Sequence, residues 1–310
     1  MGVARFKHLP KNEALTLNVE MGGQTANASI PNLLAPQPVS GLARINTGTG
    51  QRNGDTLSVN TTGLSGITAY DWRIAGGASQ GTSATLDTTG LEGEWVECVV
   101  THGGGTSTTP AVHIYEDMLS IAGGCCGGAD ADDDAILSLV PHEDATNIAV
   151  ADGDWTDVGT WYAGRVPRNG AHVLIPHGRT VTYDVNERFR LDSIRIDGTL
   201  NFALDQDTQL LAEQIICTRG STFTIGTDKN NRLPAQYTAT VIIGGIDYGH
   251  YDYAGQHDIS LARDSTLWGR AFISQGTVRL WGKDVAKGFL ATEGLSAGAT
   301  SLTLEGDPIG

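Results

Sequence analysis

Short runs of alternating apolar and polar residues, separated by glycine-rich turns, occupy the first third of the chain. Four such runs lie at residues 56–59, 69–74, 95–100 and 111–115. Alternation with a period of two places one set of side chains on a buried face and the other set in solvent, as in antiparallel strands. The pattern therefore predicts an all-β fold that begins with a small antiparallel sandwich over residues 36–116.

A different pattern begins near residue 147, where each repeat is a strand, a glycine turn and a second strand. The apolar runs 172–175, 194–196 and 215–217 precede Gly178, Gly198 and Gly220, which are 20 and 22 residues apart. That interval lies in the range of one coil of a stacked β-solenoid, whose coils bury their apolar face only against one another. Later runs at 240–243, 277–281 and 301–304 are expected to continue the stack.

The segment between these two patterns is acidic and rich in glycine. Residues 117–146 contain seven acidic residues and no basic one, and their centre reads AGGCCGGADADDDA. Glycines and like charges favour an extended chain, so we expect a flexible linker at 117–146. The aspartates at 130, 132, 133 and 134 could coordinate calcium. An EF-hand loop that started at Asp130 would have Ala135 and Pro141 in place of its glycine and glutamate, which favours a solvated linker.

Residues 1–35 show no firm period, and a Pro-X-Pro at 36–38 follows them, so this part is interpreted as an N-terminal arm. Acidic residues outnumber basic ones by 35 to 20, giving a net charge of −15, which excludes a nucleic-acid-binding surface. No apolar run approaches the roughly 18 residues that a membrane helix needs, and the start lacks the apolar region of a Sec signal. The sequence thus predicts a soluble protein without membrane insertion.

The four cysteines form neither a disulfide framework nor a zinc site, because they are few, irregularly spaced and without a CxxC pair. Adjacent Cys125 and Cys126 are expected to be free or intermolecular thiols. Trp72 in a central run and Cys98 in a later one resemble the core tryptophan and second cysteine of an immunoglobulin-like domain. The first cysteine of that domain is missing, so Cys98 is expected to pack against Trp72 as a small apolar group.

The second half of the chain resembles a G8 domain. The resemblance rests on motifs whose order and spacing are intact: 152–155 (DGDW), 160–161 (TW), 164–167 (GRVP), 175–178 (IPHG), 198–200 (GTL) and 225–226 (IG). G8 domains are extracellular all-β modules of cell-migration-inducing hyaluronidases and fibrocystin-like proteins, where they commonly lead into a right-handed parallel β-helix. The resemblance implies a G8 domain at 147–245 and the first coils of a β-helix at 246–310. It supplies no catalytic residue.

One cluster suggests carbohydrate recognition. Aromatic faces beside carboxylates and imidazoles suit sugars, which need apolar stacking and directed hydrogen bonds. The candidate glycan-binding residues are Tyr248, His250, Tyr251, Asp252, Tyr253 and His257. The alternative is that this stretch is a loop whose aromatic rings pack against the stack.

Two further groups have structural interpretations. Trp155 and Trp161 could be sugar platforms, but a solenoid needs its open end covered, which favours buried caps. His172, His177 and Asp184 could form a metal or acid–base cluster. Five residues apart on one strand, the two histidines point to opposite faces, which argues against it. No metal site, cofactor or catalytic residue is therefore predicted.

Two functions fit these features. The first is a non-catalytic structural and attachment protein, such as a phage tail fibre, a spike or a bacterial adhesin. It would bind a surface polysaccharide or receptor glycan and contact other virion or surface proteins through the arm, and a homotrimer would suit a fibre. The missing signal favours the virion over the cell surface. The second is the N-terminal part of a hyaluronidase-like enzyme that degrades glycans.

Overall fold

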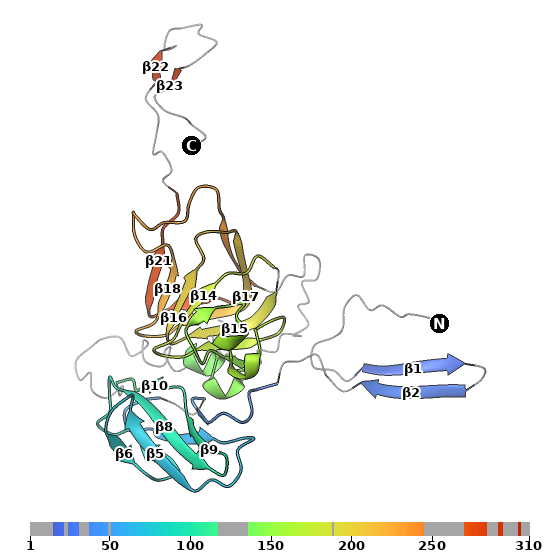
Figure 1. Cartoon of the computed structure of the whole chain (residues 1–310), viewed down its shortest axis with the longest axis vertical. Helices are drawn as coiled ribbons and strands as arrows, with labels where there is room; N and C mark the ends of the chain where they lie inside the picture. Colours follow the sequence, from blue (N-terminus) through green and yellow to red (C-terminus); the bar gives the residue numbers. More distant parts are fainter. Residues whose placement is uncertain are drawn as a thin grey trace, which may run out of the picture.

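The computed structural model describes residues 37–48, 51–116, 136–187, 189–244 and 270–283 with their side chains. It also describes the backbone of strands at 15–21, 24–30, 291–293 and 303–304. These residues form mostly strands with little helix, as the hydrophobic pattern predicts (Figure 1). Within them no helix is long and apolar enough to cross a membrane. The six candidate glycan-binding residues, Cys125, Cys126 and the acidic run 130–134 lie outside the described residues.

Residues 37–116 form two antiparallel sheets, which we call the N-terminal unit. One sheet has the order β10-β8-β5-β6, with β9 also on β8, and the other has the order β3-β4-β7. Their bounds are β3 (Arg44–Ile45), β4 (Thr56–Asn60), β5 (Ala69–Ile74), β6 (Ser79–Gly81), β7 (Thr85–Asp87), β8 (Trp95–His102), β9 (Gly105–Thr108) and β10 (Val112–His113). Ahead of this unit, β1 (Leu15–Met21) pairs antiparallel with β2 (Gln24–Ile30), so the predicted arm contains paired strands.

Trp72 is at the centre of the core between these two sheets. Its side chain is fully buried, its Nε1 donates a hydrogen bond to the Ser83 carbonyl at 2.9 Å, and Cys98 lies directly opposite it on β8. Leu57 of the other sheet joins the same apolar cluster. The predicted packing of Cys98 against Trp72 is confirmed, and burial raises the pKa of this free thiol to about 11, which leaves it inert.

Residues 147–283 form two parallel sheets, which we call the C-terminal unit. The first parallel sheet has the order β11-β13-β15-β17-β19, with β20 also on β17, and the second has the order β12-β14-β16-β18-β21. The first contains β11 (Asn147–Ile148), β13 (His172–Ile175), β15 (Arg190–Ile196), β17 (Thr208–Cys217), β19 (Ala239–Ile243) and β20 (Phe272–Ser274). The second contains β12 (Gly153–Asp154), β14 (Thr180–Tyr183), β16 (Thr199–Phe202), β18 (Thr222–Ile225) and β21 (Thr277–Leu280). From β11 to β19 the chain passes alternately from one sheet to the other, so each pair of strands makes one coil; β20 then returns to the first sheet before β21 joins the second.

The register of these strands confirms the predicted repeat. Val173, Ile194 and Ile215 are aligned in the first parallel sheet. The turn glycines serve two different purposes. Gly178 has a φ of +76°, which side chains rarely adopt, whereas a Cβ on Gly198 would lie 2.3 Å from the Pro176 carbonyl oxygen of the preceding turn. Close stacking of successive turns therefore requires glycine at 198.

Six aromatic rings form a ladder through the core of the C-terminal unit. Neighbouring ring centroids are 4.9 to 5.4 Å apart in the order Trp161, Trp155, Tyr183, Phe202, Phe223 and Phe272. Trp155 and Trp161 are buried at its start, beside the short 3₁₀ turns η3 (Val158–Thr160) and η4 (Tyr162–Gly164). Their burial confirms the interpretation as caps and rules them out as exposed sugar platforms.

Two expectations about the ends of the pattern need correction. Residues 136–146, assigned to a flexible linker, are packed: a helical turn at 136–139 places Ile136 and Val140 against Ile216 on the outer face of the first parallel sheet. Buried apolar contact thus outweighs the neighbouring charge repulsion there. The run at 301–304 was expected to continue the stack, but β23 (Thr303–Leu304) pairs antiparallel with β22 (Ala291–Glu293).

Candidate functional site: a buried polar junction

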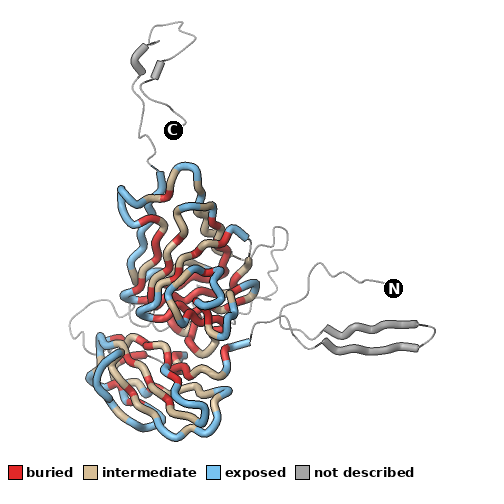
Figure 2. Tube along the Cα trace, in the orientation of Figure 1, coloured by how far each residue is buried: buried red, intermediate tan, exposed pale blue. Residues whose placement is uncertain are grey.

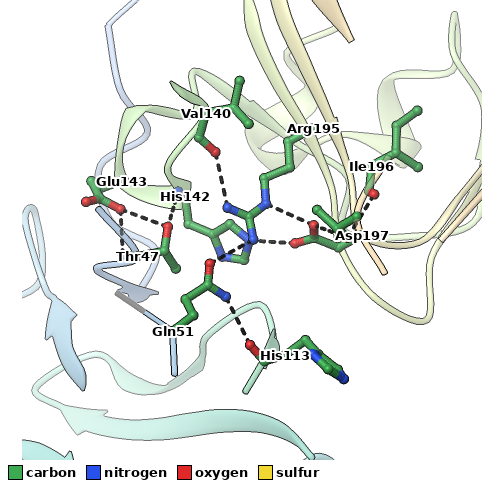
Figure 3. A network of polar contacts seen from close by, with 10 residues as sticks. Thr47, Gln51, His113, Val140, His142, Glu143, Arg195, Ile196 and Asp197 are labelled. Atoms are coloured by element: carbon green, nitrogen blue, oxygen red, sulfur yellow. Dashed lines mark hydrogen bonds and ion pairs between the residues drawn. The ribbon is translucent and has the colours of Figure 1, made fainter. Parts of the chain in front are cut away.

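The two units meet over a set of buried polar residues. Buried positions gather inside each unit and where the units adjoin (Figure 2). At that boundary, the loop after β3, the 3₁₀ turn η2 (His142–Asp144) and the end of β15 bring together six side chains (Figure 3). We call this set the junction cluster: Thr47, Gln51, His142, Glu143, Arg195 and Asp197.

Asp197 is the centre of the junction cluster. Its Oδ2 lies 2.6 Å from Nε2 of His142, and its Oδ1 accepts a hydrogen bond from Nε of Arg195 at 2.9 Å. The Thr218 hydroxyl donates a further bond to Oδ1 at 2.9 Å. The side chains of His142 and Asp197 are 0% and 1% exposed, and that of Arg195 is 4% exposed. All the strong bonds of this carboxylate are therefore made to protein, not to solvent.

Arg195 connects the two units through its remaining guanidinium nitrogens. Nη2 donates to Oε1 of Gln51 at 3.1 Å, and Nη1 donates to the Val140 carbonyl at 3.2 Å. Gln51 in turn donates to the His113 carbonyl at 3.3 Å. One side chain of the C-terminal unit thereby joins a loop of the N-terminal unit and the end of the packed segment 136–140.

Glu143 fastens the same boundary on its other side. Its carboxylate accepts hydrogen bonds from the backbone N–H groups of Thr47, at 2.9 Å, and Gly48, at 3.0 Å. The Thr47 hydroxyl accepts a bond from the His142 backbone N–H at 2.9 Å. Arg44, which is buried, donates to the Glu143 carbonyl at 2.9 Å. Burial lowers the pKa of Arg44, and its donated bond satisfies part of the guanidinium.

The charge states in the junction cluster follow from its geometry. Burial alone would raise the pKa of Asp197, but the neighbouring Arg195 and the bond from His142 lower it well below its usual range. Burial and the cationic Arg195 lower the pKa of His142, despite the opposing effect of Asp197. The set is therefore an ionised aspartate, a charged arginine and a neutral histidine whose Nε2–H donates to Asp197.

Two turns of the C-terminal unit make further contacts with the N-terminal unit. The His177 ring, in the turn between β13 and β14, stacks on Trp95 of the N-terminal unit with centroids 3.8 Å apart and planes 15° apart. The Arg219 guanidinium, in the turn between β17 and β18, lies 5.5 Å from the Tyr115 ring centroid. Burial is the first cause that lowers the pKa of three histidines here, which we call the junction histidines: His113, His142 and His177.

Acid–base chemistry on a substrate is not available to this arrangement. A histidine paired with an aspartate can act as a general base only when it reaches a substrate atom. In the junction cluster both groups are enclosed by protein, so the geometry joins the two units and exposes no reactive nitrogen. Among the described residues no group of three or more histidine, cysteine, aspartate or glutamate side chains could hold a metal ion.

The predicted cluster of His172, His177 and Asp184 is dispersed. His172 Nδ1 lies 2.9 Å from the Ser193 hydroxyl, whereas His177 packs on Trp95 in the other unit. Asp184 accepts hydrogen bonds from the backbone and hydroxyl of Thr156. The two histidines are separated as expected, but not by alternation along one strand, because His177 lies in the turn after β13.

Residues 160–289 match the family described as the G8 domain. The predicted resemblance is therefore confirmed for this part of the chain, and the match extends past the predicted boundary at 245 to include β20 and β21. No curated protein and no solved structure matches the chain.

Proposed function

We propose that this chain is a non-catalytic structural and attachment protein, such as a phage tail fibre, a spike or another virion-associated protein that binds a receptor glycan. In this proposal the N-terminal unit is an immunoglobulin-like sandwich, and the G8 domain with its later strands is the start of a right-handed parallel β-helix. The N-terminal arm would contact other virion or surface proteins.

One observation carries this proposal: both ends of the segment with the candidate glycan-binding residues are fixed on the same strand. The Gly244 N–H donates to the Ala212 carbonyl at 3.0 Å, and the Ile215 N–H donates to the Ala271 carbonyl at 2.9 Å. The described residues that flank 245–269 are therefore bonded to positions three residues apart on β17. An insertion with adjacent ends on a packed framework is a common design for a binding loop.

The junction supports the structural part of the proposal. A flexible connection would let the N-terminal unit move independently, whereas the buried junction cluster and the stacked Trp95–His177 pair give it one preferred position. An attachment device that must hold its binding surface away from its base benefits from such a connection. The enclosed His142–Asp197 pair offers no reactive group to a substrate.

A glycan array probed with the full chain tests this proposal, combined with chromatography of the bound glycans. We expect binding to a surface polysaccharide without shortening of its chains. The double variant Tyr251→Ala/Tyr253→Ala should bind more weakly at an unchanged melting temperature, because exposed aromatic rings supply contact area and not core packing. Tyr237→Ala, outside the insertion, is the matched control and should bind like the wild type.

The resemblance to the G8 domains of cell-migration-inducing hyaluronidases also suggests a second candidate, the N-terminal part of a hyaluronidase-like enzyme that degrades glycans; the family match covers residues 160–289. Shortened glycan chains in the same chromatography would support the enzyme and contradict the attachment protein. Unfolding of the double variant would show that the tyrosines pack against the stack.

A further inference from the structure

An open groove crosses the outer face of the second parallel sheet. It lies at the opposite ends of the strands from the junction with the N-terminal unit. The turns that dock on the N-terminal unit precede β14 and β18, whereas the groove lies at the C-terminal ends of β14, β16 and β18. Its volume is about 500 Å³, and the polar residues that line it include Asp154, Thr182, Asn201, Asp205, Gln206 and Asn231. None of its lining residues is among the candidate glycan-binding residues between 248 and 257, which lie outside the described residues.

The floor of the groove is a row of polar side chains, one from each coil. Asp154, Thr182, Asn201 and Thr224 are register neighbours across four parallel strands. They lie on the opposite face of the sheet from core residues such as Val181 and Leu200. Thr224 is only 4% exposed and its hydroxyl donates to the Gly226 carbonyl. Adjacent strands are about 4.8 Å apart, so Asp154, Thr182 and Asn201 offer hydrogen-bonding groups at a regular interval.

These groups have hydrogen-bonding capacity to spare. The side chains of Asp154, Thr182 and Asn201 are not buried, and within the described residues they make no hydrogen bond. Nε2 of Gln206 donates a hydrogen bond to the Asp184 carbonyl at 2.5 Å, and the amide oxygen of Gln206 takes no part in that bond. The groove therefore presents amide, hydroxyl and carboxylate groups together, which are the partners that sugar hydroxyls require.

Charge narrows the class of ligand. Three aspartates, Asp154, Asp184 and Asp205, line the groove, and no lysine or arginine does. Arg279 is opposite Thr224 on the neighbouring strand β21 and does not line the groove. A polyanion would meet unfavourable potential along most of this length, and an apolar ligand would leave the polar floor unsatisfied.

We infer that this groove binds a neutral oligosaccharide strand, aligned across the coils, and discriminates against uronate-containing chains. The inference rests on the proposed attachment function and adds a second site with a stated specificity. Trp281, 41% exposed, follows Arg279 on the same outward face of the sheet and supplies an aromatic platform beyond the row.

Titration calorimetry on the full chain tests the inference. The probes are neutral hexasaccharides of glucose, mannose and N-acetylglucosamine, with a hyaluronan hexasaccharide as the anionic probe. We expect a neutral probe to bind with an affinity that is insensitive to ionic strength. The double variant Thr182→Ala/Asn201→Ala should bind it about tenfold or more weakly, since two hydrogen bonds are lost.

A matched control lies on the same strands. Thr180 and Thr199 are register partners at the opposite ends of β14 and β16 and do not line the groove, so Thr180→Ala/Thr199→Ala should bind like the wild type. Melting temperatures of both double variants establish that each is folded.

The other outcomes overturn the inference in distinguishable ways. Binding that survives Thr182→Ala/Asn201→Ala but is lost in Tyr251→Ala/Tyr253→Ala would refute the groove and leave the proposed function standing. Preference for hyaluronan, or binding that weakens with salt, would refute the neutral ligand class. Absence of binding to every sugar would refute both the groove and glycan attachment.

Discussion

Replacing Asp197 with asparagine tests whether the junction cluster holds the two units together. The substitution preserves the shape of the side chain but removes the negative charge that faces Arg195 and His142. Arg195, whose side chain is 4% exposed, would then be a buried cation without a counter-ion. Its remaining bonds, to Gln51 and the Val140 carbonyl, are made with neutral groups.

The expected loss is near the lower end of the range for broken buried ion pairs. Removing one partner of such a pair costs about 3–5 kcal/mol, mainly because the other charge stays buried. The asparagine oxygen can still accept one hydrogen bond, so we expect about 3 kcal/mol for Asp197→Asn. At 2–4 °C per kcal/mol for a domain of this size, the melting temperature should fall by roughly 6–12 °C.

Scanning calorimetry of the full chain measures this effect. Glu187→Gln removes an exposed carboxylate of the same unit and should change stability by no more than about 0.5 kcal/mol. If Asp197→Asn melted as the control does, the junction cluster would not stabilise the docking, and the reasoning from buried charge would be wrong.

Three other predictions concern pH, the core of the N-terminal unit and the stacked turns. Lowering the pH from 7.5 to 5.5 should reduce the melting temperature: the junction histidines have lowered pKa values in the fold, so the unfolded chain binds more protons below about pH 6.5 and stability is lost as the pH falls. Trp72→Ala should cost about 3–5 kcal/mol as a large core truncation but leave the C-terminal unit folded, as two transitions in calorimetry would show; a single unchanged transition would contradict it. Gly198→Ala should lower the melting temperature more than Gly178→Ala, because its Cβ would meet a backbone oxygen at 2.3 Å while the Cβ at 178 meets nothing within 4 Å; equal effects would refute the close-stacking argument.

The fold was largely predictable because its two units repeat their local patterns. In the C-terminal unit the apolar runs recur at a nearly constant interval, and constant interval is what parallel register requires, so Val173, Ile194 and Ile215 could be aligned before any coordinates. The contact between Trp72 and Cys98 was predicted from the resemblance to the core tryptophan and second cysteine of an immunoglobulin-like domain, and the two residues are opposite each other on β5 and β8. The run at 301–304 misled because two residues of strand propensity do not specify a partner.

The junction was not predicted because the composition of residues 117–146 indicated a flexible linker. His142 and Glu143 follow an acidic, glycine-rich stretch, and all of 117–146 was interpreted as a linker. The apolar run ILSLV at 136–140 within it indicates a packed segment. Arg195, near the end of β15, and Asp197, directly after that strand, are two residues apart and therefore project to the same side. A charged pair on a sheet face indicates that something polar covers it, but alternation cannot identify a partner more than 50 residues away. The candidate glycan-binding residues between 248 and 257 remain a prediction.

Val173, Ile194 and Ile215 are separated by a constant interval of 21 residues, so the C-terminal unit can be longer or shorter by whole coils. Among the described residues, Tyr183, Phe202 and Phe223 each contact one ring before and one ring after in the ladder, so a single coil does not determine how many others exist. Duplication of a single coil would move everything beyond it by about 4.8 Å without requiring a new type of contact. The length of the unit could therefore change by whole coils while the contacts between neighbouring coils stay the same.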